Sequence, residues 1–119
     1  MLIDLHAHTS LESWDSTLTP DELVESARST GLDGICLTEH DQFWDRRRAE
    51  ELGQRHNFVV IPGCEITTEQ GHLLAFGIES YVYGMHRTPF LRKYVDMAGG
   101  TLLAVHPYRR VYVDESEPW

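Results

Sequence analysis

The sequence predicts an α/β fold, because short apolar strands alternate with longer stretches of helical composition. Five apolar runs are separated mostly by segments of about 10 to 15 residues, which is the rhythm of βα units around a parallel sheet or barrel. The chain has 119 residues, of which 41% are hydrophobic, so it can bury one modest core. A single α/β domain is therefore expected.

The individual elements follow from apolar periodicity and from the residues that begin and end helices. The expected elements are strand 2–6, helix 19–31, strand 34–38, helix 43–55, strand 58–61, strand 72–78, helix 88–98 and strand 102–105. Thr19 is a good N-cap with Pro20 at the first helical position. Pro62 and Gly63 predict the end of the third strand. The short link after it favours an antiparallel pair or hairpin with the fourth strand.

Composition restricts the class of function. The formal net charge is −9, with 19 acidic against 10 basic residues, which disfavours non-specific binding to nucleic acid or to membrane surfaces. Nucleic acid is thus expected only as a substrate. Cys36 and Cys64 lie in apolar runs and are expected to be buried thiols. No apolar run approaches the ~20 residues of a membrane span, and the N-terminus lacks a basic leader, so a cytoplasmic protein without a membrane partner is expected.

Histidines gather where the predicted strands end. In parallel α/β folds the active site lies at the carboxyl ends of the strands. His6 and His8 end the first strand, and residues two apart on an extended chain point to the same side. Two imidazoles within ~7 Å can chelate one ion. An isolated His-x-His pair is weak evidence, and both residues could simply end a strand.

Later strand ends add further candidates. His40 and His106 follow the second and fifth strands, and Glu65 follows the third. Each also has an ordinary alternative: a helix-entry histidine, a loop histidine and a surface carboxylate, respectively. Asp15, in the loop after the first strand, is either a ligand or a surface residue. His72 begins the fourth strand instead of ending it, so its part in a metal site stays open, as does that of Glu79 at the other end of this strand.

Taken in order along the chain, these segments resemble the motifs of the PHP (polymerase and histidinol phosphatase) family. Residues 4–10 (DLHAHTS) are similar to the first motif, and residues 37–41 (LTEHD) to the second, where Glu39 replaces the more common Asp. Residues 63–65 (GCE) resemble the segment with a bridging glutamate, and residues 104–107 (AVHP) resemble the third motif. The loop at Asp15 is similar to that of the small phosphoesterase branch.

The resemblance implies a distorted (βα)7 TIM-like barrel of PHP type, of which this chain covers about the first five strands. Residues 1–119 are expected to form a single PHP domain. The DxH motif that closes the family's domain is absent after His106, so the domain is expected to be C-terminally truncated.

The resemblance also implies a cluster of two or three divalent metal ions, with Zn, Mn or Fe as candidates. His6, His8 and Glu65 are expected to bind one ion, and Glu65 to bridge to a second that His106 helps to hold. Asp15 and His40 are expected to approach a third. Arg109, three residues after His106, is expected to contact a substrate phosphate. Glu65, His40 and Arg109 are the expected catalytic residues.

The implied activity is metal-dependent hydrolysis of a small phosphorylated substrate by a metal-activated water. Two alternatives remain. The chain is a PHP module of a polymerase-like assembly, or it is a metal-binding fragment without turnover. The sequence leaves the substrate, the metal and the oligomeric state open.

Overall fold

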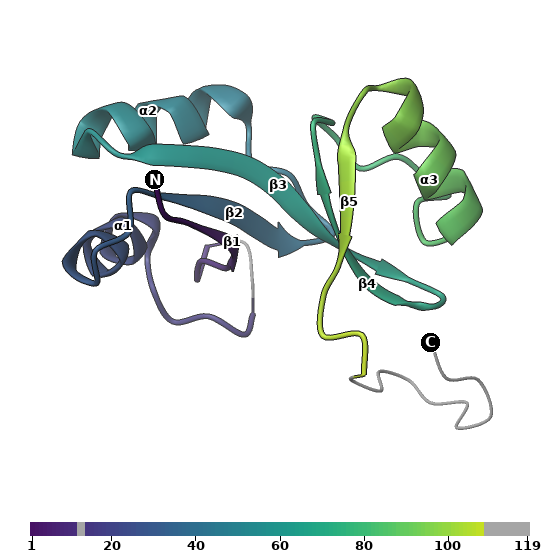
Figure 1. Cartoon of the computed structure of the whole chain (residues 1–119), viewed down its shortest axis with the longest axis horizontal. Coiled ribbons are helices and arrows are strands. Elements are labelled where there is room, and N and C mark those ends of the chain that lie inside the picture. The colour runs from purple at the N-terminus through teal and green to yellow at the C-terminus, as the bar shows by residue number, and fades with distance from the viewer. Residues whose placement is uncertain (12–13, 109–119) are drawn as a thin grey trace.

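The computed structural model describes residues 1–11 and 14–108, which form one five-stranded sheet with three helices (Figure 1). The strands lie in the order β1-β2-β3-β4-β5. The elements are β1 (Ile3–Ala7), α1 (Pro20–Ser29), β2 (Gly34–His40), α2 (Arg46–His56), β3 (Val59–Thr68), β4 (Gly71–Phe76), α3 (Thr88–Met97) and β5 (Thr101–Ala104). The predicted α/β class is confirmed, and the sheet curls as half of a barrel.

Strand direction decides which residues meet at one edge of the sheet. β1, β2 and β3 are parallel, β4 is antiparallel to β3, and β5 is antiparallel to β4. β5 therefore runs in the direction of the first three strands, while β4 alone is reversed. The prediction of an antiparallel β3–β4 pair is confirmed. As a result, the beginning of β4 lies at the same edge as the ends of β1, β2 and β5.

Two apolar clusters hold the helices against the sheet. One joins α1 and α2 to β2, through buried residues that include Val24, Leu37 and Leu52. The other packs α3 on β3 and β4, through residues that include Ile66 and Leu91. Because side chains alternate across a strand, the neighbours of these core residues point to the opposite face of the sheet. That face carries the polar residues described below.

Two predicted boundaries were wrong by three residues or more, and the others agree to within two residues. β3 does not stop at Pro62 and Gly63 but continues to Thr68, with Pro62 opposite Leu37 of β2. A proline lacks an N–H and is tolerated where a strand has no neighbour on that side. β4 pairs with β3 only from Cys64 onward, which leaves that side open at Pro62. Helix α2 begins later than predicted, at Arg46, because Asp45 caps it by accepting the N–H of Arg48.

The remaining helix predictions hold. Thr19 caps α1 by accepting the N–H of Glu22, with Pro20 as the first helical residue. α3 begins at Thr88 as expected. Within residues 1–11 and 14–108, none of the helices has both the length and the apolar character needed to cross a membrane.

Gly63 fixes the approach of β4 to β3 two residues before Glu65. A Cβ at this position would lie 2.7 Å from two ring carbons of Phe76 and 3.0 Å from the carbonyl oxygen of Ala75. Gly63→Ala is therefore expected to lower the free energy of unfolding by about 1–3 kcal/mol, through overpacking. Urea denaturation of the metal-free protein measures this loss. In a Phe76→Leu background the same substitution should cost less, and an equal cost in both backgrounds would contradict the proposed clash.

Candidate metal centre

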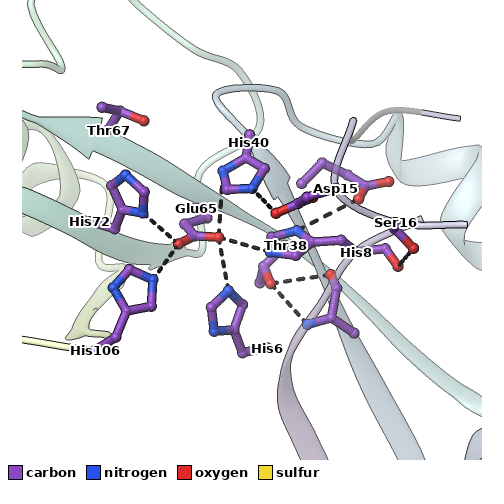
Figure 2. Close-up of polar contacts among 12 residues, drawn as sticks. His6, His8, Asp15, Ser16, Thr38, His40, Glu65, Thr67, His72 and His106 are labelled. Carbon is purple, nitrogen blue, oxygen red and sulfur yellow. Dashed lines mark hydrogen bonds and ion pairs between the residues drawn. The ribbon is translucent and has the colours of Figure 1, made fainter. Parts of the chain in front are cut away.

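One buried carboxylate lies at the middle of the polar face. Glu65 is 1% exposed, and its two oxygens face different imidazoles (Figure 2). Oε2 lies 2.8 Å from Nε2 of His6 and 2.9 Å from Nε2 of His8. Oε1 lies 2.8 Å from Nδ1 of His72 and 3.0 Å from Nε2 of His106. The carboxylate thus stands between two pairs of nitrogen donors.

The sheet register explains why distant residues meet here. Glu65 of β3 is the register partner of His40 of β2, so both side chains leave the same face, and Nδ1 of His40 lies 3.5 Å from Oε2 of Glu65. On the antiparallel side, Thr67 is opposite His72. Glu65 was expected just beyond the end of the third strand, but it lies inside β3. The reversal of β4 brings His72 beside Glu65, which makes it a candidate ligand together with the other imidazoles.

A local irregularity in β1 presents the first two histidines. The pairing of β1 with β2 shifts register between Asp4 and Ala7. The hydroxyl of Thr38 accepts the N–H of Ala7 at 3.1 Å, which ties the end of β1 to β2. The rings of His6 and His8 meet edge to face at 4.9 Å. The pair therefore points to one side, as the sequence predicted.

The loop after β1 returns to the centre and adds a second carboxylate. Ser16 donates its hydroxyl to the carbonyl oxygen of His8 at 3.0 Å, and the N–H of Ser10 donates to the carbonyl oxygen of Leu18 at 2.7 Å. These bonds hold the loop so that Oδ2 of Asp15 lies 2.8 Å from Nε2 of His40. Asp15 is thus placed beside His40, as expected.

Backbone strain coincides with the centre. Asp41 and His106, which follow β2 and β5, adopt positive φ angles of 53° and 33°. Such angles are unfavourable for residues other than glycine and often mark functional sites. Asp41 is held in this conformation because its Oδ1 accepts the N–H of Thr67 at 2.7 Å.

The charges of the centre are mutually stabilising. Burial raises the pKa of Glu65, but hydrogen bonds from His6 and His8 outweigh it and hold this pKa far below its usual range. Burial lowers the pKa of His8, yet the hydrogen bond and charge of Glu65 and the charge of Asp15 leave it raised. The pKa of Asp15 is lowered overall, because the hydrogen bond and charge of His40 outweigh its partial burial. The carboxylates are therefore ionised at neutral pH.

The donor set fits divalent metal ions. Three groups bring their ligand atoms within 4.8 Å of one another: His6 with His8 and Glu65, His8 with Asp15 and His40, and His40 with Glu65 and His72. His106 adds a nitrogen beside Oε1 of Glu65. Mixed imidazole and carboxylate donors suit Zn, Mn and Fe. We call the seven candidate ligands the metal centre: His6, His8, Asp15, His40, Glu65, His72 and His106.

Two other residues raised by the sequence have other surroundings, and a third, Arg109, lies outside the described residues. Glu79 is exposed, and its Oε1 lies 3.7 Å from a guanidinium nitrogen of Arg46. Cys64 is fully buried on the opposite face of β3, and burial raises the pKa of its thiol, so it is poorly suited to act as a nucleophilic thiolate.

Glu39 supports the residues around His8 from the helix-covered face of the sheet. The sequence showed only that it replaces an Asp that is more common in the motif. Its side chain is fully buried and leaves β2 toward the helices, opposite to His40. Oε1 accepts the N–H of Thr9 at 2.7 Å, and Oε2 accepts the Thr9 hydroxyl and the indole N–H of Trp44, the latter at 2.9 Å. Nδ1 of His8 lies 3.9 Å from Oε1. Glu39 thus fixes the chain that follows His8.

Replacement of Glu39 by glutamine keeps the size of the side chain but removes its negative charge and one of its acceptor oxygens. The N–H groups of Thr9 and Trp44 both need an acceptor, but an amide has only one oxygen, so its NH2 group faces a donor in either orientation. Glu39→Gln is expected to lower the free energy of unfolding by about 1–3 kcal/mol. Trp44→Phe removes one donor, so the double variant should lose less than the sum of the single losses in urea denaturation. Additive losses would contradict these roles.

Comparison with known proteins places this geometry in a family. The model of the PHP domain matches residues 4–115. An error-prone DNA polymerase of Nocardia farcinica is 36% identical over 64 residues, covering 54% of this chain and 6% of the polymerase. A phosphoribosyl 1,2-cyclic phosphate 1,2-diphosphodiesterase of Eggerthella lenta is 32% identical over 85 residues, covering 66% of this chain and 32% of that protein. The chain therefore spans a third or less of these relatives.

Solved structures agree with this placement. A protein of Bifidobacterium adolescentis, provisionally assigned as a metal-dependent phosphoesterase, superposes with a TM-score of 0.54 at 38% identity over 63% of this chain and 27% of its own. An amidohydrolase of Chromobacterium violaceum, at 24% identity and a TM-score of 0.56, covers 82% of this chain and 33% of its own and shares the fold. Strand order, histidine positions and the match over residues 4–115 together identify this chain as a member of the PHP domain family.

Proposed function

We propose that this chain carries the metal-binding part of a phosphoesterase that hydrolyses a small phosphorylated substrate. The observation that carries the proposal is the buried Glu65 carboxylate, whose two oxygens each face a separate pair of imidazoles. A carboxylate in this position can bridge two cations and hold them close together. Paired divalent ions are a recurrent device for displacement at phosphorus.

The chain's own residues would share the work as follows. His6 and His8 would hold a cation on one side of Glu65, and His72 and His106 would hold one on the other side. His40 and Asp15 form a third position through their 2.8 Å contact. Divalent ions at these positions would neutralise charge on phosphoryl oxygens and lower the pKa of coordinated water. We retain Arg109 as a proposed phosphate contact, since its guanidinium suits bidentate binding.

The cellular setting is part of the proposal. We place the protein in the cytoplasm, with the substrate as its main partner and without a membrane. We further propose that residues 1–119 are the N-terminal part of a longer PHP domain, because the chain matches 32% of the diphosphodiesterase and 27% of the phosphoesterase structure.

A second function has its own support. Error-prone DNA polymerases are among the relatives, with 36% identity over 64 residues to that of Nocardia farcinica. A PHP module within a polymerase-like assembly would need the metal centre for structure or for hydrolysis of nucleic-acid ends. The acidic net charge of −9 favours the small-substrate alternative, because a polyanion would be repelled.

The proposal is tested by metal content and phosphate release together. The wild-type chain should retain near-stoichiometric Zn or Mn and release phosphate from small phosphomonoesters. His6→Ala/His8→Ala and Glu65→Gln should lose metal, with activity falling by at least about 100-fold, since ligands matter no less than the groups that support them. His86→Ala, at an exposed histidine outside the centre, is the matched control and should change neither value.

The combination of outcomes distinguishes the alternatives. Metal that disappears in the ligand variants, without phosphate release in any sample, would favour a metal-binding module without turnover. Unchanged phosphate release in folded His6→Ala/His8→Ala protein would refute the proposed function. Far-UV circular dichroism verifies that each variant is folded.

A further inference from the structure

A stack of three rings leads from the metal centre to the surface. The rings of His8 and His40 lie 4.4 Å apart at an interplanar angle of 16°. The ring of Trp14 continues the series, with its centroid 6.1 Å from that of His40 at 19°. These values describe offset stacking of nearly parallel rings. Trp14 is thus the outermost member of a stack whose inner members are candidate metal ligands.

Trp14 differs from the other exposed apolar residues because the next residue in the chain belongs to the metal centre. Its side chain is 88% exposed, whereas Trp44 is 6% exposed and donates its indole N–H to Glu39. A single exposed apolar side chain needs no special explanation. Trp14, however, directly precedes Asp15, which contacts His40 at 2.8 Å. The indole therefore lies at the rim of the metal centre, with most of its surface open to solvent.

We propose that Trp14 determines specificity by stacking on a planar ring of the substrate, and that the substrate is a nucleoside monophosphate. This inference rests on the proposed function, because it assumes that the phosphate is bound at the metal centre. Every nucleobase has a π-face that an aromatic side chain can cover. With its phosphate beside His40 and Asp15, a nucleotide would direct its base toward Trp14. The nucleobase would then be the fourth ring of the stack, on the outer side of Trp14.

Charge favours a mononucleotide over a long strand. The chain has a net charge of −9, and binding of a polynucleotide depends on many cationic contacts to phosphates. A mononucleotide carries a single phosphate, which cations in the metal centre can neutralise. The aromatic contact then supplies selectivity without requiring a basic surface.

The test compares two ligands that differ only in the base. Isothermal titration calorimetry of the Zn-loaded chain should show that adenosine 5′-monophosphate binds more tightly than ribose 5-phosphate. Trp14→Leu should weaken binding of the nucleotide about tenfold, the order expected for loss of one stacked base, and leave ribose 5-phosphate unchanged. Trp14→Phe should retain most of the preference. Tyr83→Leu is the matched control, because Tyr83 is 90% exposed but its ring contacts His86.

Several results would overturn the inference. Equal binding of both ligands by the wild type, or an equal loss of both in Trp14→Leu, would mean that Trp14 only shapes the loop at Asp15. Zn content and circular dichroism show whether Trp14→Leu keeps the fold and the centre. If phosphate release is intact but base preference is absent, this inference fails and the proposed function stands. If the nucleotide binds through Trp14 but no phosphomonoester is hydrolysed, the proposed function fails while the stacking contact is supported.

Discussion

The arrangement depends on one ionised carboxylate that is almost completely removed from solvent. Burial of an unpaired charge is strongly unfavourable, so the carboxylate of Glu65 needs hydrogen-bonding partners around both of its oxygens. Among the described residues, five imidazoles supply it, all within 3.5 Å of its oxygens. The same side chains that satisfy the carboxylate supply the imidazole and carboxylate donors that could hold a metal ion. Stability and the proposed metal binding therefore depend on one set of residues.

Glu65 can have this role because it lies inside β3 and not at its end. A residue inside the strand has neighbours on both sides, and here one neighbour is parallel and the other antiparallel. The parallel partner contributes His40 in direct register. The antiparallel partner contributes His72 from the beginning of its strand. A sheet of parallel strands alone would have brought that position to the opposite edge, far from the centre.

The sequence predicted much of this arrangement, and its failures have physical causes. Capping and spacing located α1 and α3, and the histidines at strand ends were brought together as expected. The end of β3 was mispredicted, because a proline stops a strand only where its missing N–H would have had a partner. His72 stayed undecided, because the rule of carboxyl strand ends holds only for parallel strands. The short link before it was the available signal.

Side chains alternate along β2, so this strand contributes polar contacts on both faces of the sheet. Thr38 and His40 face the metal centre, while Glu39 between them is buried toward Trp44. Glu39 also accepts the backbone N–H and the hydroxyl of Thr9, which ties the chain just after His8 to this strand. A longer carboxylate at position 39 reaches farther from the strand than the aspartate common in the family. The buried indole N–H of Trp44 therefore finds its acceptor in this longer side chain, which also accepts both polar hydrogens of Thr9.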